Sequence, residues 1–299
     1  MTLPNFLVIG TAKAGTTSLY HCLNAHPQVY MSPVKEPNHF AGADGHRDFP
    51  KSPFGEHPWT DYDAYLVLFD GVSDEIAIGE ASTAYLYNHN APERIKRLIP
   101  EARFVAILRQ PADRAYSMYL QARRDLLEDN RDFAKALEQE DARIRDRYEF
   151  VLHYRRPGFY HEQLCRWFRH FPRERFLVFL YEDWDDSSRM LRETYRFLGV
   201  DDGFVPASIT RHNAACVPRH HDLQLFFSRR NPLRDTIKAM LPGRVWQGAA
   251  DLARNIRQKN LTEPPPLDPE LRRQLTEGYR DDILRLQDLI ARDLSGWLY

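Results

Sequence analysis

The chain has 299 residues and a formal net charge of −1, with 41 Lys and Arg residues against 42 Asp and Glu residues. This length allows a sizeable core, in one large α/β domain or two small ones. Because basic charge is not in excess, neither nucleic acid nor an anionic membrane is expected as a partner, and any anion site must be local.

Apolar runs of strand length alternate with helical patterns along the chain. We expect strands at residues 6–10, 75–80, 104–108 and 175–183. We expect helices at residues 16–24, 92–99, 111–126, 187–200 and 268–292. Short, uniformly apolar strands separated by helices are typical of a parallel sheet covered on both faces. The pattern predicts an α/β fold with a central parallel sheet flanked by helices, in a single domain over residues 1–299.

Two segments depart from this alternation. Residues 41–65 are rich in Gly, Pro, His and Asp, and predict a long irregular loop. Residues 129–156 are dense in charge and in helix-forming residues, which favours a solvent-exposed helix.

The cysteines and the N-terminus predict a cytoplasmic protein. Cys22, Cys165 and Cys216 lie far apart and form no CxxC pair, which is typical of reduced thiols. The first ten residues, MTLPNFLVIG, lack the charged region of a signal peptide. No segment approaches the roughly 18 apolar residues of a membrane span.

The segment FLVIGTAKAGTTSL, residues 6–19, predicts an anion-binding loop between a strand and a helix. Unpaired backbone N–H groups and the positive end of the helix dipole meet there, and glycines let the ligand approach closely. A nucleoside triphosphate P-loop would read GxxxxGK[ST], but Thr16 stands at its lysine position and Lys13 lies inside the loop. The residues expected to bind phosphate are Lys13, Ala14, Gly15, Thr16, Thr17 and Ser18.

Two motifs resemble those of sulfotransferases that use 3′-phosphoadenosine 5′-phosphosulfate (PAPS). KAGTTSL, residues 13–19, is similar to their 5′-phosphosulfate loop, and AILRQPADRAYSMYLQ, residues 106–121, to their 3′-phosphate segment. The nearest resemblance is to the branch with heparan sulfate sulfotransferases and many bacterial members. It implies a P-loop-kinase-like sulfotransferase fold, PAPS as co-substrate, and Arg109 and Ser117 on the 3′-phosphate. Arg suits this role because it binds phosphate bidentately.

The resemblance also implies catalytic residues. EASTAY, residues 80–85, is similar to an E-K-S-x-x-Y segment, so Glu80 is the expected base, although Ala81 stands where relatives often have Lys. Lys13 is expected to stabilise charge on the departing phosphate oxygen, and Lys35 of KEPNHF to hold the sulfonate or the acceptor.

A late loop, RHNAACVPRHHDL at residues 211–223, corresponds to a third nucleotide contact in relatives. Arg219 and His220 are the expected contacts there, although the loop lacks the KGR sequence of the glycan enzymes. The spacing of His212, His220 and His221 gives no compact ligand set, so no metal is expected.

Three interpretations of the function stay open. The first is a PAPS-dependent sulfotransferase acting on a small-molecule or carbohydrate acceptor, through a hydroxyl or an amine. The second is a P-loop nucleotide-dependent kinase or phosphotransferase, against which Thr16 and the Arg109/Ser117 pair argue. The third is a non-catalytic nucleotide-binding protein, which would have no need to keep Lys13 and Glu80. Neither the acceptor nor the oligomeric state follows from the sequence.

Overall fold

The computed structural model describes residues 2–42, 58–208, 217–218 and 260–299. Its centre is a parallel five-stranded sheet in the order β2-β3-β1-β4-β5. The strands are β1 (Phe6–Gly10), β2 (Val29–Met31), β3 (Ala77–Ala81), β4 (Arg103–Leu108) and β5 (Phe176–Leu180). A separate antiparallel pair joins β6 (Val217–Pro218) to β7 (Leu261–Thr262). The predicted α/β class is confirmed, while the prediction of one domain over 1–299 stays a prediction.

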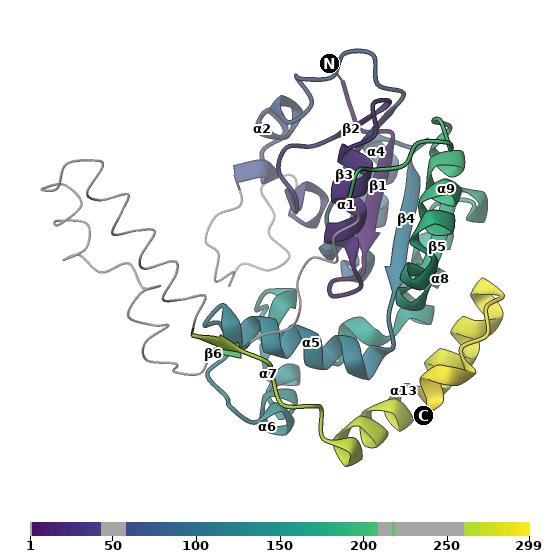
Figure 1. Ribbon diagram of the computed structural model, residues 1–299. Helices are drawn as coiled ribbons and strands as arrows, with labels where there is room; N and C mark the ends of the chain where they lie inside the picture. Colours follow the sequence, from purple (N-terminus) through teal and green to yellow (C-terminus); the bar gives the residue numbers. More distant parts are fainter. Residues whose placement is uncertain (1, 43–57, 209–216, 219–259) are drawn as a thin grey trace, which may run out of the picture.

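Helices cover both faces of the sheet (Figure 1). The longer ones are α1 (Thr16–Asn24), α4 (Ala91–Leu98), α5 (Pro111–Arg124), α8 (Tyr160–Phe168), α9 (Ser187–Leu198) and α13 (Pro269–Ile290). Shorter ones are α2 (Tyr62–Val67), α3 (Ala84–Tyr87), α6 (Phe133–Glu138) and α7 (Glu140–Arg145). Short 3₁₀ helices are η1 (His39–Ala41), η2 (Pro58–Thr60), η3 (Phe150–Leu152), η4 (Arg156–Gly158), η5 (Arg173–Arg175), η6 (Tyr181–Asp186) and η7 (Ser295–Leu298). Within the described residues, no helix is long and apolar enough to cross a lipid bilayer.

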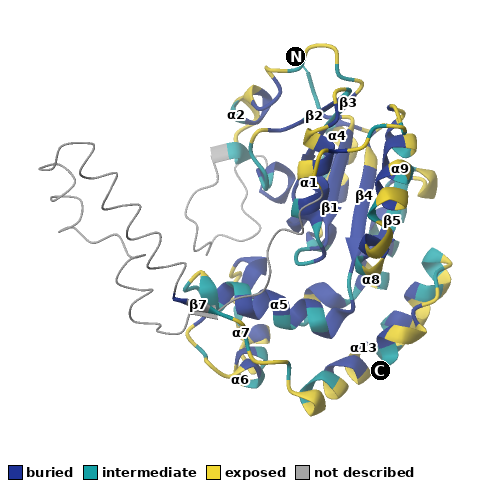
Figure 2. Ribbon diagram, viewed as in Figure 1, coloured by how far each residue is buried: buried dark blue, intermediate teal, exposed yellow. Residues whose placement is uncertain are grey.

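The side chains of β1 alternate between two hydrophobic clusters. Phe6 and Val8 pack with residues of α1 and α9, whereas Leu7 and Ile9 pack with residues of α3, α4, α5, α8 and α13. Alternate side chains of a strand point to opposite faces of the sheet, so both faces are buried. Figure 2 shows the strands as buried throughout most of their length. This explains why their sequences are uniformly apolar.

The structure differs from the predicted elements in two informative places. The predicted strand 175–183 ends at Leu180, because the next six residues coil into η6. The predicted exposed helix over 129–156 is wrong: α6 and α7 are two short helices, and Phe133 and Glu140 are buried. Most of the predicted loop at 41–65 lies outside the described residues.

The carboxyl ends of the strands meet α5. Helix α5 runs across this end of the sheet, beside the loop that follows β1 (Figure 1). In an open α/β sheet this edge is where ligands bind. The first two motifs of the sequence therefore lie at the expected ligand-binding edge.

Candidate functional site

The loop between β1 and α1 forms one wall of the site. Lys13 and Gly15 have left-handed backbone conformations, with φ of 73° and 91°. Gly15 is also the N-cap of α1, whose first turn carries no acidic residue. A Cβ on Gly15 would lie 2.4 Å from Nε1 of Trp184, so a larger residue does not fit there. The loop thus offers the positive end of α1 to an anion.

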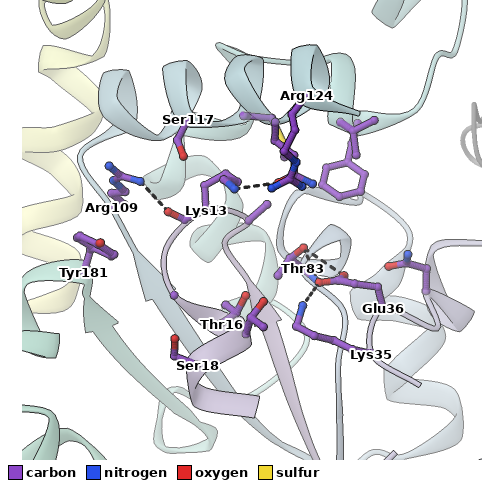
Figure 3. Close-up of a pocket in the computed structure, with 18 of the residues that line it drawn as sticks. Lys13, Thr16, Ser18, Lys35, Glu36, Thr83, Arg109, Ser117, Arg124 and Tyr181 are labelled. Carbon is purple, nitrogen blue, oxygen red and sulfur yellow. Dashed lines mark hydrogen bonds and ion pairs between the residues drawn. The ribbon is translucent and has the colours of Figure 1, made fainter. Parts of the chain in front are cut away.

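A cavity of about 380 Å³ opens beside this loop (Figure 3). Among the expected site residues, those that line it are Lys13, Gly15, Thr16, Thr17, Ser18, Lys35, Arg109 and Ser117. Ala14 is fully buried in the apolar cluster with α1 and does not line the cavity. Residues from distant motifs of the chain therefore meet at one cavity.

Lys13 and Arg109 bring two positive charges to the same part of the cavity. The Lys13 ammonium donates a hydrogen bond to Oε1 of Gln121 on α5 at 2.9 Å. The Arg109 guanidinium donates to the backbone oxygen of Lys13 at 3.0 Å and lies 4.7 Å from the ring centroid of Tyr181. Ser117 faces them from α5 (Figure 3). This arrangement can hold two phosphate groups that lie some distance apart on one ligand.

Lys35, Glu36 and Thr83 form a second polar group on the cavity wall (Figure 3). The Glu36 carboxylate is ion-paired with Lys35 and accepts the backbone N–H of Thr83 at 2.7 Å. The Thr83 hydroxyl lies 3.1 Å from both Glu36 carboxylate oxygens. Glu36 also has a positive φ of 61°.

Glu80, the expected base, does not line the cavity. It lies at the end of β3 in register with Leu7, and its side chain is fully buried. Its two oxygens accept hydrogen bonds from the Ser82 hydroxyl at 2.8 Å and the Tyr85 hydroxyl at 2.7 Å. Burial raises the pKa of Glu80 to about 7, despite the lowering by those two hydrogen bonds. Its catalytic role stays a prediction, and its position argues against direct contact with an acceptor.

Glu80 instead supports the segment that carries Glu36. The Ser82 oxygen accepts the backbone N–H of Asn38 at 3.0 Å, and the Tyr85 oxygen accepts that of Phe40 at 3.3 Å. The two hydroxyls that donate to Glu80 therefore also hold the chain just after Glu36. Such a fully connected buried network fixes one conformation of that segment.

Several cavity residues were not predicted. Gln121 and Arg124 line it from the same face of α5 as Ser117, at spacings of four and three residues. That helical periodicity is a signal which the sequence contains. Glu36 directly follows the predicted Lys35 in the sequence, which is a second signal that the sequence contains. The other unpredicted lining residues are Ala12, Asn38, Thr83, Met118, Glu149, Phe150, Val151, Tyr181 and Trp184.

Two of the expected nucleotide contacts, Arg219 and His220, lie outside the described residues. Within the described part of the chain, no group of three or more His, Cys, Asp or Glu side chains could hold a metal ion.

Comparison with known proteins shows which family this chain resembles. A family model described as "Sulfotransferase domain" matches residues 3–214. The chain is 32% identical to the human bifunctional heparan sulfate N-deacetylase/N-sulfotransferase 3, over 66% of the chain and 22% of that protein. It is 27% identical to the human heparan sulfate glucosamine 3-O-sulfotransferase 5, over 71% of the chain and 56% of that protein. The chain spans about a fifth of the length of the bifunctional relatives that it matches.

A solved structure is similar along the whole chain. The crystal structure of a sulfotransferase from Alicyclobacillus acidocaldarius superposes with a TM-score of 0.73 and 31% sequence identity, covering 100% of both chains. The five-stranded parallel sheet and its flanking helices are thus those of a sulfotransferase structure.

Proposed function

The chain belongs to the sulfotransferase family, and we propose that it transfers the sulfuryl group of PAPS to a hydroxyl or amine of a small-molecule or glycan acceptor. The observation that carries this proposal is the meeting of Lys13, Arg109 and Ser117 at one cavity at the carboxyl edge of the sheet. The cytoplasm is the proposed location, because three widely spaced cysteines without a CxxC pair are typical of reduced thiols.

The donors on the cavity wall fit PAPS. The nucleotide carries a phosphosulfate on its 5′ side and a phosphate on its 3′ side. The loop at residues 11–15 with Lys13 suits the first group, and Arg109 with Ser117 suits the second. Gly15 has a left-handed backbone, and a Cβ there would clash with the Trp184 indole, so this position of the loop requires glycine.

We assign the role of base to Glu36 in place of Glu80. Bound PAPS supplies an activated sulfuryl group, and the chain must orient the acceptor and take its proton. Glu36 lines the cavity, and Lys35 and Thr83 hold its carboxylate in place. A carboxylate fixed in this way can accept a proton from a hydroxyl or amine. Lys13, beside the loop, stabilises the negative charge that develops on the departing phosphate oxygen.

Ligand-dependent thermal stability tests the nucleotide. PAPS, and adenosine 3′,5′-diphosphate (PAP), should raise the melting temperature without added magnesium, because both bind the folded state. ATP should do so much less, because it lacks the 3′-phosphate for Arg109 and Ser117. Transfer of label from ³⁵S-PAPS to a panel of alcohols, phenols, amines and glycans then identifies the acceptor. Equal stabilisation by ATP, or a strict magnesium requirement, would favour the kinase alternative.

A further inference from the structure

Trp184 presents an unsatisfied hydrogen-bond donor at the cavity. The residue belongs to η6, lines the cavity, and is 5% exposed. Its indole nitrogen Nε1 is buried and has no hydrogen-bond partner among the described residues. A buried donor without an acceptor destabilises a fold, so native structures rarely keep one unless water or a ligand completes it.

Other tryptophans of the described chain do not share this feature. The Trp167 indole donates to the backbone oxygen of Leu86 at 3.3 Å, and the Trp297 indole donates to Oε1 of Glu182 at 2.9 Å. The fold thus supplies acceptors to indole groups that serve packing. At Trp184 no described residue accepts the indole N–H, so the donor is available to a ligand in the cavity.

The position of the indole indicates the chemistry of its partner. Its Nε1 packs so closely on Gly15 that a Cβ there would lie 2.4 Å away. Gly15 is the last residue before α1, where the helix dipole and the loop backbone favour an anion. An indole can only donate a hydrogen bond, so its partner must be an acceptor. A phosphate or sulfonate oxygen on the loop meets both requirements.

Two contacts from the C-terminal part of the chain hold η6 in place. Both carboxylate oxygens of Asp183 accept hydrogen bonds from the Arg292 guanidinium, at 3.1 and 2.8 Å. The Asp183 carboxylate also accepts the backbone N–H of Leu180 at 2.8 Å. On the other side of Asp183, Glu182 accepts the Trp297 indole. Trp184 is therefore presented by a fixed turn.

We propose that Trp184 is a nucleotide-binding residue whose indole N–H donates a hydrogen bond to the anionic group on the 5′ side of the nucleotide, bound at residues 11–15. The identity of that nucleotide rests on the proposed function. The contact comes from the connection between β5 and α9, which carries no phosphate-binding motif. It adds a neutral donor beside the charge of Lys13.

Calorimetric titration of Trp184→Phe tests this directly, because phenylalanine keeps an aromatic ring and removes the N–H. Affinity for PAP and for 5′-AMP should fall about tenfold or more, the usual effect of losing a hydrogen bond to a charged group. Affinity for 3′-AMP should not change, since it lacks the 5′ group. Without ligand, the melting temperature of Trp184→Phe should be no lower than that of Trp167→Phe, which loses an indole hydrogen bond that is made in the folded protein.

Trp167→Phe is the matched control: it should lower the melting temperature and leave PAP affinity intact. If Trp184→Phe folds poorly, wild-type protein with ¹⁵N-labelled tryptophan gives the same answer. One indole signal, assigned through Trp184→Tyr, should then move on adding PAP or 5′-AMP and stay in place with 3′-AMP. Unchanged PAP affinity in Trp184→Phe, or an indole signal that does not respond, would overturn the proposal.

The two proposals fail in different ways. If wild-type protein binds 5′-AMP or ATP but not PAP, the proposed function fails while Trp184 can still be tested on the 5′-phosphate. If wild-type protein binds PAP and transfers sulfate, but Trp184→Phe binds PAP equally well, then the assignment of Trp184 alone is wrong.

Discussion

Glu36 and Glu80 differ in what their carboxylates contact. Glu36 lines the cavity with Lys35, whereas Glu80 is buried beneath it and accepts two hydroxyl hydrogen bonds. Both carboxylates lie close enough for the Glu36 charge to help raise the pKa of Glu80, after the larger effect of burial. A base must reach the acceptor's proton, so position separates their roles.

Replacing each carboxylate by its amide tests this separation at the residue scale. Glu36→Gln should lower turnover by about 10²- to 10⁴-fold, the usual loss for a general base, with PAP affinity near that of wild type. Glu80→Gln should cost less, within about tenfold, since it disturbs only the support of the 36–40 segment. Rates with ³⁵S-PAPS and PAP titrations on both variants provide the measurement.

A phenol acceptor supplies the control for the same pair. Because a phenol ionises at high pH, it should partly rescue Glu36→Gln as the pH rises. A folded and fully active Glu36→Gln enzyme beside an inactive Glu80→Gln enzyme would return the role of base to Glu80.

At the scale of elements, the C-terminal helix is joined to the cavity wall through η6. Burial raises the pKa of Asp183, but hydrogen bonds from Arg292 and from the Leu180 backbone outweigh this and hold it below the usual value. The carboxylate is therefore ionised and depends on those donors. Helix α13 shares the hydrophobic cluster of α5 and α8, so its end is fixed relative to the cavity.

Arg292→Met should weaken this connection. Its side chain is 37% exposed, so the loss of unfolding free energy should be modest, about 1–2 kcal/mol. PAP affinity should also fall a few-fold, because η6 carries Trp184 and Tyr181. Urea unfolding and PAP titration measure the two effects. Arg273→Met is the matched control, since its pair with Glu270 is largely exposed and should matter little. Equal behaviour of the two variants would contradict the coupling.

At the scale of the whole molecule, the buried carboxyl of Glu80 makes stability depend on pH. Its pKa is about 7 in the folded protein, against an ordinary value of 4.5 for a glutamate. Between these values the unfolded chain releases the proton while the folded protein keeps it, so the free energy of unfolding falls as the pH rises. Burial lowers the pKa of His153 to about 4 from 6.5, which has the opposite effect over roughly the same range.

Glu80→Gln should therefore gain stability relative to wild type as the pH rises from 4.5 to 7, by about 3 kcal/mol. Urea unfolding curves of both proteins at several pH values give this difference. His153→Gln should show the reverse trend, losing its advantage over wild type as the pH rises. A difference between Glu80→Gln and wild type that stays constant with pH would mean that Glu80 ionises normally in the folded state.

The local sequence pattern predicted most strands of the sheet. It failed where contacts between distant segments determine the structure and burial of a segment. Helix α1 has the predicted bounds, because the apolar strand and the glycine loop before it are local signals. Strand β2, with three residues, was too short to stand out. In the 129–156 segment, charged residues suggested exposure, but Glu140 is buried and accepts the backbone N–H groups of Arg155 and Arg156. Charge alone does not reveal such partners.

For the site, the glycines that follow a strand predicted the anion loop from local pattern, whereas Arg109 and Ser117 were expected only from the resemblance to sulfotransferase motifs. Both of these residues line the cavity. The tertiary structure alone decided which glutamate meets the cavity. Glu80 pairs in register with Leu7, and a side chain in that register faces the packed core. It also decided that Trp184, far along the chain, lies against Gly15. Register and packing join segments that no local pattern relates, so these contacts depend on the fold as a whole.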